Sequence, residues 1–118
     1  MTNLVACLST GKGTWGHVVR LIAEYDWKKI ILITNEFGRE NFKSEKNIEF
    51  VVVDSLKPVG ELINDIKVGL RGKFSGTEVG LNLVSGTGKE HMALLSAVLK
   101  LGLGVRLVAV TKDGVQEL

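Results

Sequence analysis

Residues 4–34 read LVACLSTGKGTWGHVVRLIAEYDWKKIILIT, and this stretch contains a complete strand–helix–strand unit. Its two ends, Leu4–Leu8 and Ile30–Ile33, are short apolar runs bounded by polar residues, which is the pattern of strands buried on both faces. Between them, Gly13–Tyr25 carries apolar residues at helical spacing. The stretch therefore predicts two parallel strands joined by a helix that packs on them.

The same alternation continues along the rest of the chain. Further strands are predicted at Phe50–Val53, Glu78–Val84 and Val105–Val110, and further helices at Glu36–Lys46, Pro58–Leu70 and Lys89–Leu101. Asp113-Gly114 is typical of a tight turn, here into a short last strand. Continuous apolar strands that alternate with helices indicate a parallel sheet covered on both faces, and right-handed crossovers make it doubly wound.

We therefore expect residues 1–118 to form a single α/β domain of three layers. In this Rossmann-like domain, a mainly parallel five-stranded sheet has the strand order 3-2-1-4-5, and the short C-terminal strand is added at its edge. Sheets of this kind bind ligands at the carboxyl ends of the strands, where the winding reverses. In this order the reversal lies between the first and fourth strands.

The composition narrows the classes of function. The chain has 15 Lys and Arg against 13 Asp and Glu, a formal net charge of +2, so we expect no direct binding of duplex DNA. No apolar stretch approaches the roughly 18 residues of a membrane span, and residues 1–25 lack the pattern of a secretory leader. We expect a cytoplasmic protein without membrane contacts. Because Cys7, His17 and His91 are the only cysteine and histidines, we predict neither a metal nor a cofactor.

Two loops of similar chemistry follow the first and fourth strands. The first loop, Ser9–Gly16, and the second, Ser85–His91, are both rich in Gly, Ser or Thr, and Lys, and both open a helix. Glycine lets the backbone approach an anion, the amides at a helix start donate to it, and lysine adds a full charge. The two loops therefore predict a phosphate or nucleotide site, with ordinary helix capping as the plain alternative.

Two nucleotide motifs can be compared with these loops. Gly11, Gly13 and Gly16 satisfy the GxGxxG pattern of dinucleotide sites, and Glu36 follows at the expected distance. Against this interpretation, Trp15 is bulky beside the expected pyrophosphate, and the chain leaves no room for a substrate domain. A phosphate-binding P-loop is excluded, because Lys89 is followed by Glu90 and not by Ser or Thr.

Residues 83–94, LVSGTGKEHMAL, resemble the second motif of CARF domains, the CRISPR-associated Rossmann fold. Ser9-Thr10-Gly11 is similar to the first motif of that family, and the resemblance covers nearly the whole chain. It implies a stand-alone domain that senses nucleotides and forms a homodimer, with a cyclic oligoadenylate bound across the paired crevices. Some members of the family, the ring nucleases, cleave this ligand without a metal through attack of a ribose 2′-hydroxyl on the neighbouring phosphate.

The resemblance also implies which residues form the site. Lys89 would contact the phosphate, and Ser9 or Thr10 would orient the 2′-hydroxyl, so these three are the catalytic candidates. The predicted ligand-binding residues are Gly11, Lys12, Gly13, Thr14, Asn35, Ser85, Gly86, Thr87, Gly88 and His91. Met92, Leu95 and Leu99 add apolar surface to the fourth helix, which favours a dimer interface there. The alternatives are a minimal NAD(P)-type dinucleotide-binding module and a regulatory subunit without catalysis.

Overall fold

A computed structural model describes residues 3–8 and 11–118 of the chain. Strands in this part of the chain are β1 Asn3–Cys7, β2 Lys29–Thr34, β3 Glu49–Val52, β4 Glu78–Asn82, β5 Gly104–Thr111 and β6 Gly114–Glu117. Helices there are the 3-10 turn η1 Lys12–Thr14 and the α-helices α1 Trp15–Ala23, α2 Glu36–Asn41, α3 Val59–Leu70 and α4 Gly88–Lys100. Among these helices, none is both long enough and apolar enough to cross a membrane.

The strands form one sheet in the order β3-β2-β1-β4-β5-β6. The first five strands run parallel, and β6 pairs with β5 in the opposite direction, with Val110 opposite Val115. The predicted α/β class, strand order and C-terminal edge strand are confirmed. The winding reverses between β1 and β4, as the order requires.

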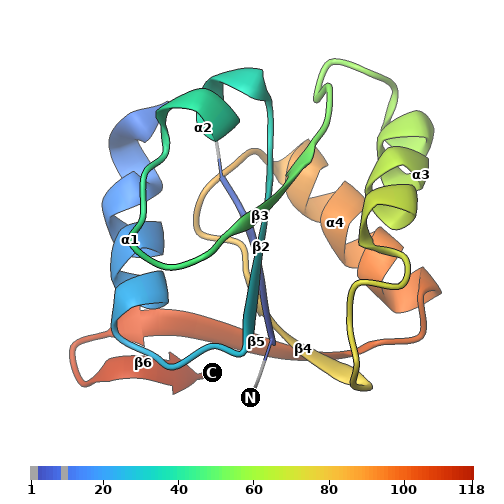
Figure 1. Cartoon of the computed structure of the whole chain (residues 1–118). Helices are drawn as coiled ribbons and strands as arrows, with labels where there is room; N and C mark the ends of the chain where they lie inside the picture. The colour runs from blue at the N-terminus through green and yellow to red at the C-terminus, as the bar shows by residue number, and fades with distance from the viewer. Residues whose placement is uncertain (1–2, 9–10) are drawn as a thin grey trace.

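Helices cover both faces of the sheet. Figure 1 shows α1 and α2 on one side and α3 and α4 on the other. β1 is buried along its whole length, and its residues alternate between the two layers. Leu4 and Ala6 belong to the cluster beneath α1, whereas Val5 and Cys7 belong to the cluster beneath α3 and α4. This double burial explains why the strand is a continuous apolar run.

Three predicted elements differ from the structure by two residues or more at one or both ends. The helix expected at Glu36–Lys46 ends at Asn41, because Phe42 leaves it in an extended conformation and buries its ring against Trp15, with ring centroids 5.5 Å apart. The helix expected at Gly13–Tyr25 begins with η1 and continues as α1 only to Ala23. The fourth strand, expected to reach Val84, ends at Asn82.

The end of β4 has a local cause. The side chain of Asn82 is buried, and its amide donates to the carbonyl of Val108 at 2.8 Å. Its Oδ1 accepts a hydrogen bond from the N–H of Val84 at 3.3 Å. This turn, in which an asparagine side chain binds the backbone two residues later, takes the chain out of the ladder.

Candidate functional site

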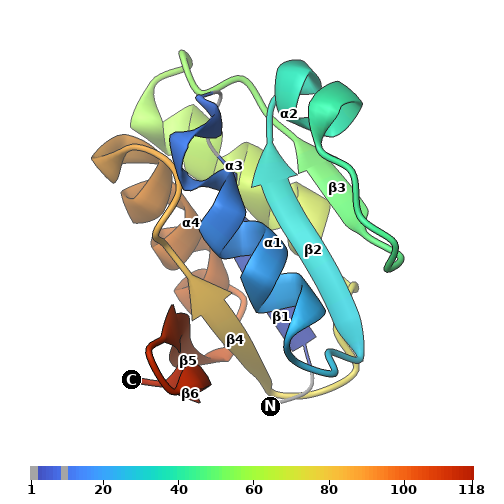
Figure 2. The ribbon, with the colours of Figure 1, turned by 90° about the vertical axis from the view of Figure 1, so that its left-hand side faces the viewer.

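The two predicted loops lie at the carboxyl ends of β1 and β4. Figure 2 shows that α1 and α4 both begin at the end of the sheet toward which the strands point. Ser9 and Thr10, two of the three catalytic candidates, lie outside the described residues. The described part of the first loop consists of Gly11 and η1, and the second loop runs from Leu83 to Thr87.

A hydrogen bond joins the described parts of the two loops. The hydroxyl of Thr14 donates to Oγ of Ser85 at 2.6 Å, although the two residues are 71 positions apart. Ser85 is completely buried, whereas Thr14 is partly exposed. Thr14 is therefore partly accessible to solvent, and the buried Ser85 holds its hydroxyl in place through this hydrogen bond. We expect Ser85 to act on a ligand through Thr14.

Gly86 gives the second loop its shape. Its φ of +113° favours glycine, and a Cβ there would lie 2.7 Å from Sγ of Cys7 and 3.0 Å from Nε2 of His91. Nε2 of His91 lies 2.8 Å from the carbonyl oxygen of Ser85, so this nitrogen carries the hydrogen and donates it. His91 therefore positions the loop backbone through this nitrogen.

Cys7 lies beneath this loop, and its thiol is buried and unreactive at neutral pH. Its side chain is 1% exposed, and burial, with a smaller contribution from the Glu90 carboxylate, raises the pKa of the thiol to about 12. A thiol with this pKa stays protonated at neutral pH, and the thiolate is the nucleophilic form. Cys7 thus serves as packing under the site.

The start of α4 combines a cap with an exposed lysine. Oγ1 of Thr87 accepts from the N–H of Glu90 at 3.2 Å, and the Glu90 carboxylate accepts from the N–H of Thr87 at 2.8 Å. Thr87 and Glu90 thus form a capping box, so Thr87 has the ordinary structural role as well. Lys89 follows Gly88 in the first turn, is exposed, and forms no ion pair with any described residue. A cation is unfavourable at a helix start unless an anion lies nearby.

Lys12 is the first residue of η1 and lies beside two aromatic rings. Its ammonium is 5.6 Å from the ring centroid of Trp15 and 5.8 Å from that of Phe37, which belongs to α2. A Cβ added at Gly11 or Gly13 would meet no heavy atom within 4 Å, so the backbone around Lys12 borders open space. The same is true of Gly88, the first residue of α4.

Comparisons of the chain with protein-family models and with curated proteins find no match.

The dinucleotide motif receives mixed support from the geometry of the site. The third glycine of such a motif allows close packing of helix on strand, yet a Cβ on Gly16 would meet nothing within 4 Å. Trp15 is buried among aromatic rings and does not crowd the loop, which removes one objection to the motif. Glu36 follows β2 as the motif requires, but its carboxylate pairs with Arg39.

Asn35 lies between the end of β2 and the start of α2. Its side chain caps α2 by accepting from the N–H of Gly38 at 2.9 Å. It lines a groove between the ends of β2 and β3 together with Val52 and Asp54. Within residues 3–8 and 11–118, no group of three or more His, Cys, Asp or Glu side chains is placed to hold a metal ion.

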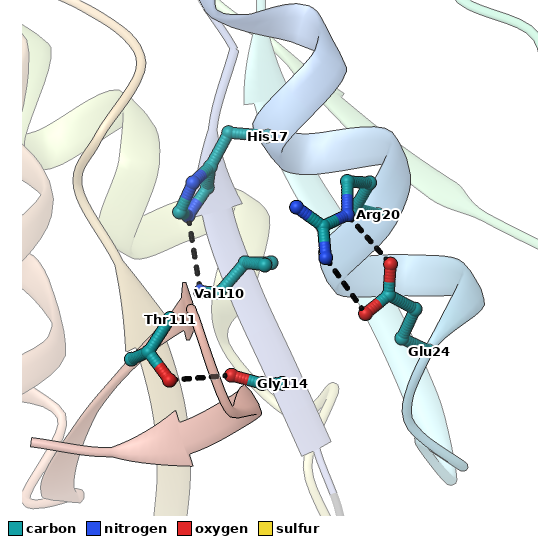
Figure 3. A network of polar contacts seen from close by, with 6 residues as sticks. All are labelled: His17, Arg20, Glu24, Val110, Thr111 and Gly114. Carbon is teal, nitrogen blue, oxygen red and sulfur yellow. Dashed lines mark hydrogen bonds and ion pairs between the residues drawn. The ribbon is translucent and has the colours of Figure 1, made fainter.

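A polar network near the site was missed from the sequence. Nε2 of His17 lies 3.1 Å from the side-chain amide nitrogen of Asn82 and 3.5 Å from the N–H of Val110, a contact shown in Figure 3. Because both neighbours are donors, Nε2 acts as the acceptor and is unprotonated. Burial, followed by the charge of Arg20, lowers the pKa of His17. The polar Asn82 within an apolar strand was the signal available in the sequence.

Proposed function

We propose that this protein is a nucleotide-sensing domain that binds a cyclic oligoadenylate-type ligand in the crevice between β1 and β4. The observation that carries the proposal is the hydrogen bond between Thr14 and Ser85, which links the loop after β1 to the loop after β4. The carboxyl ends of β1 and β4, where the winding reverses, are the place at which doubly wound sheets bind their ligands.

The chemistry of the loops suits a phosphodiester. The exposed ammonium of Lys89 and the exposed backbone of Gly13 and Gly88 supply one charge and neutral donors. The hydroxyl oxygen of Thr14, whose hydrogen goes to Ser85, can accept a hydrogen bond from a ribose hydroxyl. An anion beside Lys89 would also offset the unfavourable position of this cation at the start of α4. His91 and Gly86 would contribute indirectly, because they set the backbone conformation of the second loop.

The proposal includes a homodimer through α4. Met92 and Leu99 are 68% and 57% exposed, and with Leu95 they line an apolar groove of about 420 Å³ along this helix. Met92 follows Lys89 by one helical turn, so a two-fold contact along this face would bring two copies of the second loop toward one ligand.

The test is a binding series on the whole chain. Cyclic oligoadenylates, NAD(P) and adenosine phosphates are screened by thermal shift, and a true ligand at about 100 times its dissociation constant adds about 2.7 kcal/mol of stability. Lys89→Ala should lower the affinity for cyclic oligoadenylate about ten- to a hundredfold, since a charge-assisted contact is lost. Chromatography of the ligand after incubation shows in addition whether it is cleaved.

Lys28→Ala is the matched control, because Lys28 is an exposed lysine that directly precedes β2, at the opposite end of the strand from the loops. Its affinity should equal that of the wild type. Stabilisation by NAD(P) alone, or an unchanged affinity in Lys89→Ala, would overturn the proposal.

A further inference from the structure

A groove of about 630 Å³ lies beside this crevice, at the carboxyl ends of β2 and β3. One wall comes from the start of α2 and includes Phe37, an exposed residue with 40% of its surface accessible. The opposite wall comes from Val52 at the end of β3 and from Asp54 and Leu56 in the following segment. The exposed part of the Phe37 ring is therefore an aromatic surface at the edge of an open groove.

Phe37 connects this groove to the first loop. The ammonium of Lys12 lies 5.8 Å from the centroid of its ring, and the ring of Trp15 supports it from the core at 6.0 Å. β1 and β2 are hydrogen-bonded neighbours, so the segments that follow them emerge side by side. A molecule whose anionic end lies at Lys12 can therefore reach the aromatic surface with its other end.

The two regions differ in charge. Three carboxylates line the groove: Glu36 pairs with Arg39, Asp65 pairs with Lys57, and Asp54 forms no ion pair with any described residue. Asp54 is held in place, because its Oδ1 accepts from the N–H of Leu56 at 3.0 Å. Carboxylate oxygens accept hydrogen bonds from hydroxyl and amino groups but offer no donor to a phosphate. A nucleotide has this division, with an anionic end and a neutral end rich in donors.

We infer that this groove is the nucleoside subsite: the base stacks on Phe37, the ribose hydroxyls face the carboxylates, and the phosphate lies toward Lys12 and the first loop. The inference rests on the proposed function and adds to it the residues that would distinguish a nucleotide from a simple polyphosphate. Stacking on an aromatic side chain stabilises a complex with any of the bases, because every base has a π-face.

The test compares ATP with inorganic triphosphate by titration calorimetry. The two probes carry the same chain of three phosphates and differ by the nucleoside, so their ratio of affinities measures the subsite. We expect ATP to bind about tenfold more tightly than triphosphate to the wild type. Phe37→Ala should remove this difference and leave triphosphate affinity unchanged, whereas Phe37→Tyr, which keeps a ring, should retain it.

Val68→Ala is the control, because Val68 is an exposed apolar residue of α3 outside this groove. Equal affinity of the wild type for the two probes, or an equal loss for both in Phe37→Ala, would overturn the inference while leaving the phosphate site of Lys89 intact. If neither probe binds, the nucleoside subsite is refuted. The titration of cyclic oligoadenylate against Lys89→Ala then decides the proposed function separately.

Discussion

At Gly86 the absence of a side chain has a measurable consequence. Gly86→Ala would strain the left-handed backbone and press a methyl group against Cys7, which should cost about 2–4 kcal/mol of unfolding free energy. Gly16→Ala is the counterpart, because its Cβ would enter open space on α1 and should raise stability by about 0.5 kcal/mol. Urea unfolding of both variants measures the two effects. Equal unfolding midpoints of the two variants would show that the backbone conformation at position 86 does not require glycine.

His17 makes stability depend on pH. Its pKa is lowered in the folded protein from the ordinary 6.5, so the unfolded chain binds a proton more readily. The stability due to the neutral ring is therefore complete above pH 6.5 and is lost as the pH falls below this value toward the folded pKa. His17→Gln, which cannot take up the proton, should lose less stability than the wild type between about pH 7.5 and pH 5.5. Identical acid sensitivity of the two proteins in urea unfolding would contradict this assignment.

Residue pairs distant in sequence were the part of the site that could not be predicted. The Ser and Thr residues of both loops were identified, because their type and their place after apolar strands are local signals. That Thr14 binds Ser85, or that Asn82 binds His17, depends on where two strands meet. Nothing in a single sequence fixes such side-chain partners, and tertiary packing decided them.

Among the elements, α1 depends on a lysine from a distant segment. Nζ of Lys46 donates to the carbonyls of Ile22 and Tyr25, both at 2.7 Å, at the C-terminal end of this helix. Lys46→Met keeps the apolar stem but removes the cation, and should lower the unfolding free energy by about 1–2 kcal/mol. The exposed Lys43 of the same segment is the control, and Lys43→Met should stay within about 0.5 kcal/mol of the wild type in urea unfolding. A loss as large in the control would rule out a specific cap.

Elements were predicted well where the signal was local. The strands of the sheet are continuous apolar runs because helices cover both of its faces, and this pattern needs no knowledge of partners. The end of α2 was misplaced because it depends on the contact of Phe42 with Trp15, which lies in another helix. The start of α4 was predicted to within one residue, because Thr87 and Glu90 form a local capping box.

For the whole molecule, the exposed apolar face of α4 predicts assembly. The wild type should be a dimer in light scattering at micromolar concentration, and Met92→Glu combined with Leu99→Glu should make it a monomer. Charges in a buried two-fold contact are repeated by the symmetry and repel one another. Val68→Glu, on the exposed face of α3, should leave the dimer intact. A wild-type monomer would refute the interface.

The thiol beneath Gly86 gives the protein an internal reporter. Cys7 is the only cysteine of the chain, it is 1% exposed, and the second loop lies directly above its sulfur. A thiol reagent can react with it only after this part of the molecule has opened, so the labelling rate measures how often opening occurs. Any molecule that holds the loop closed should slow the labelling in proportion to its occupancy. Ligands can thus be ranked by reaction time on the unmodified protein, without an attached dye or an engineered residue.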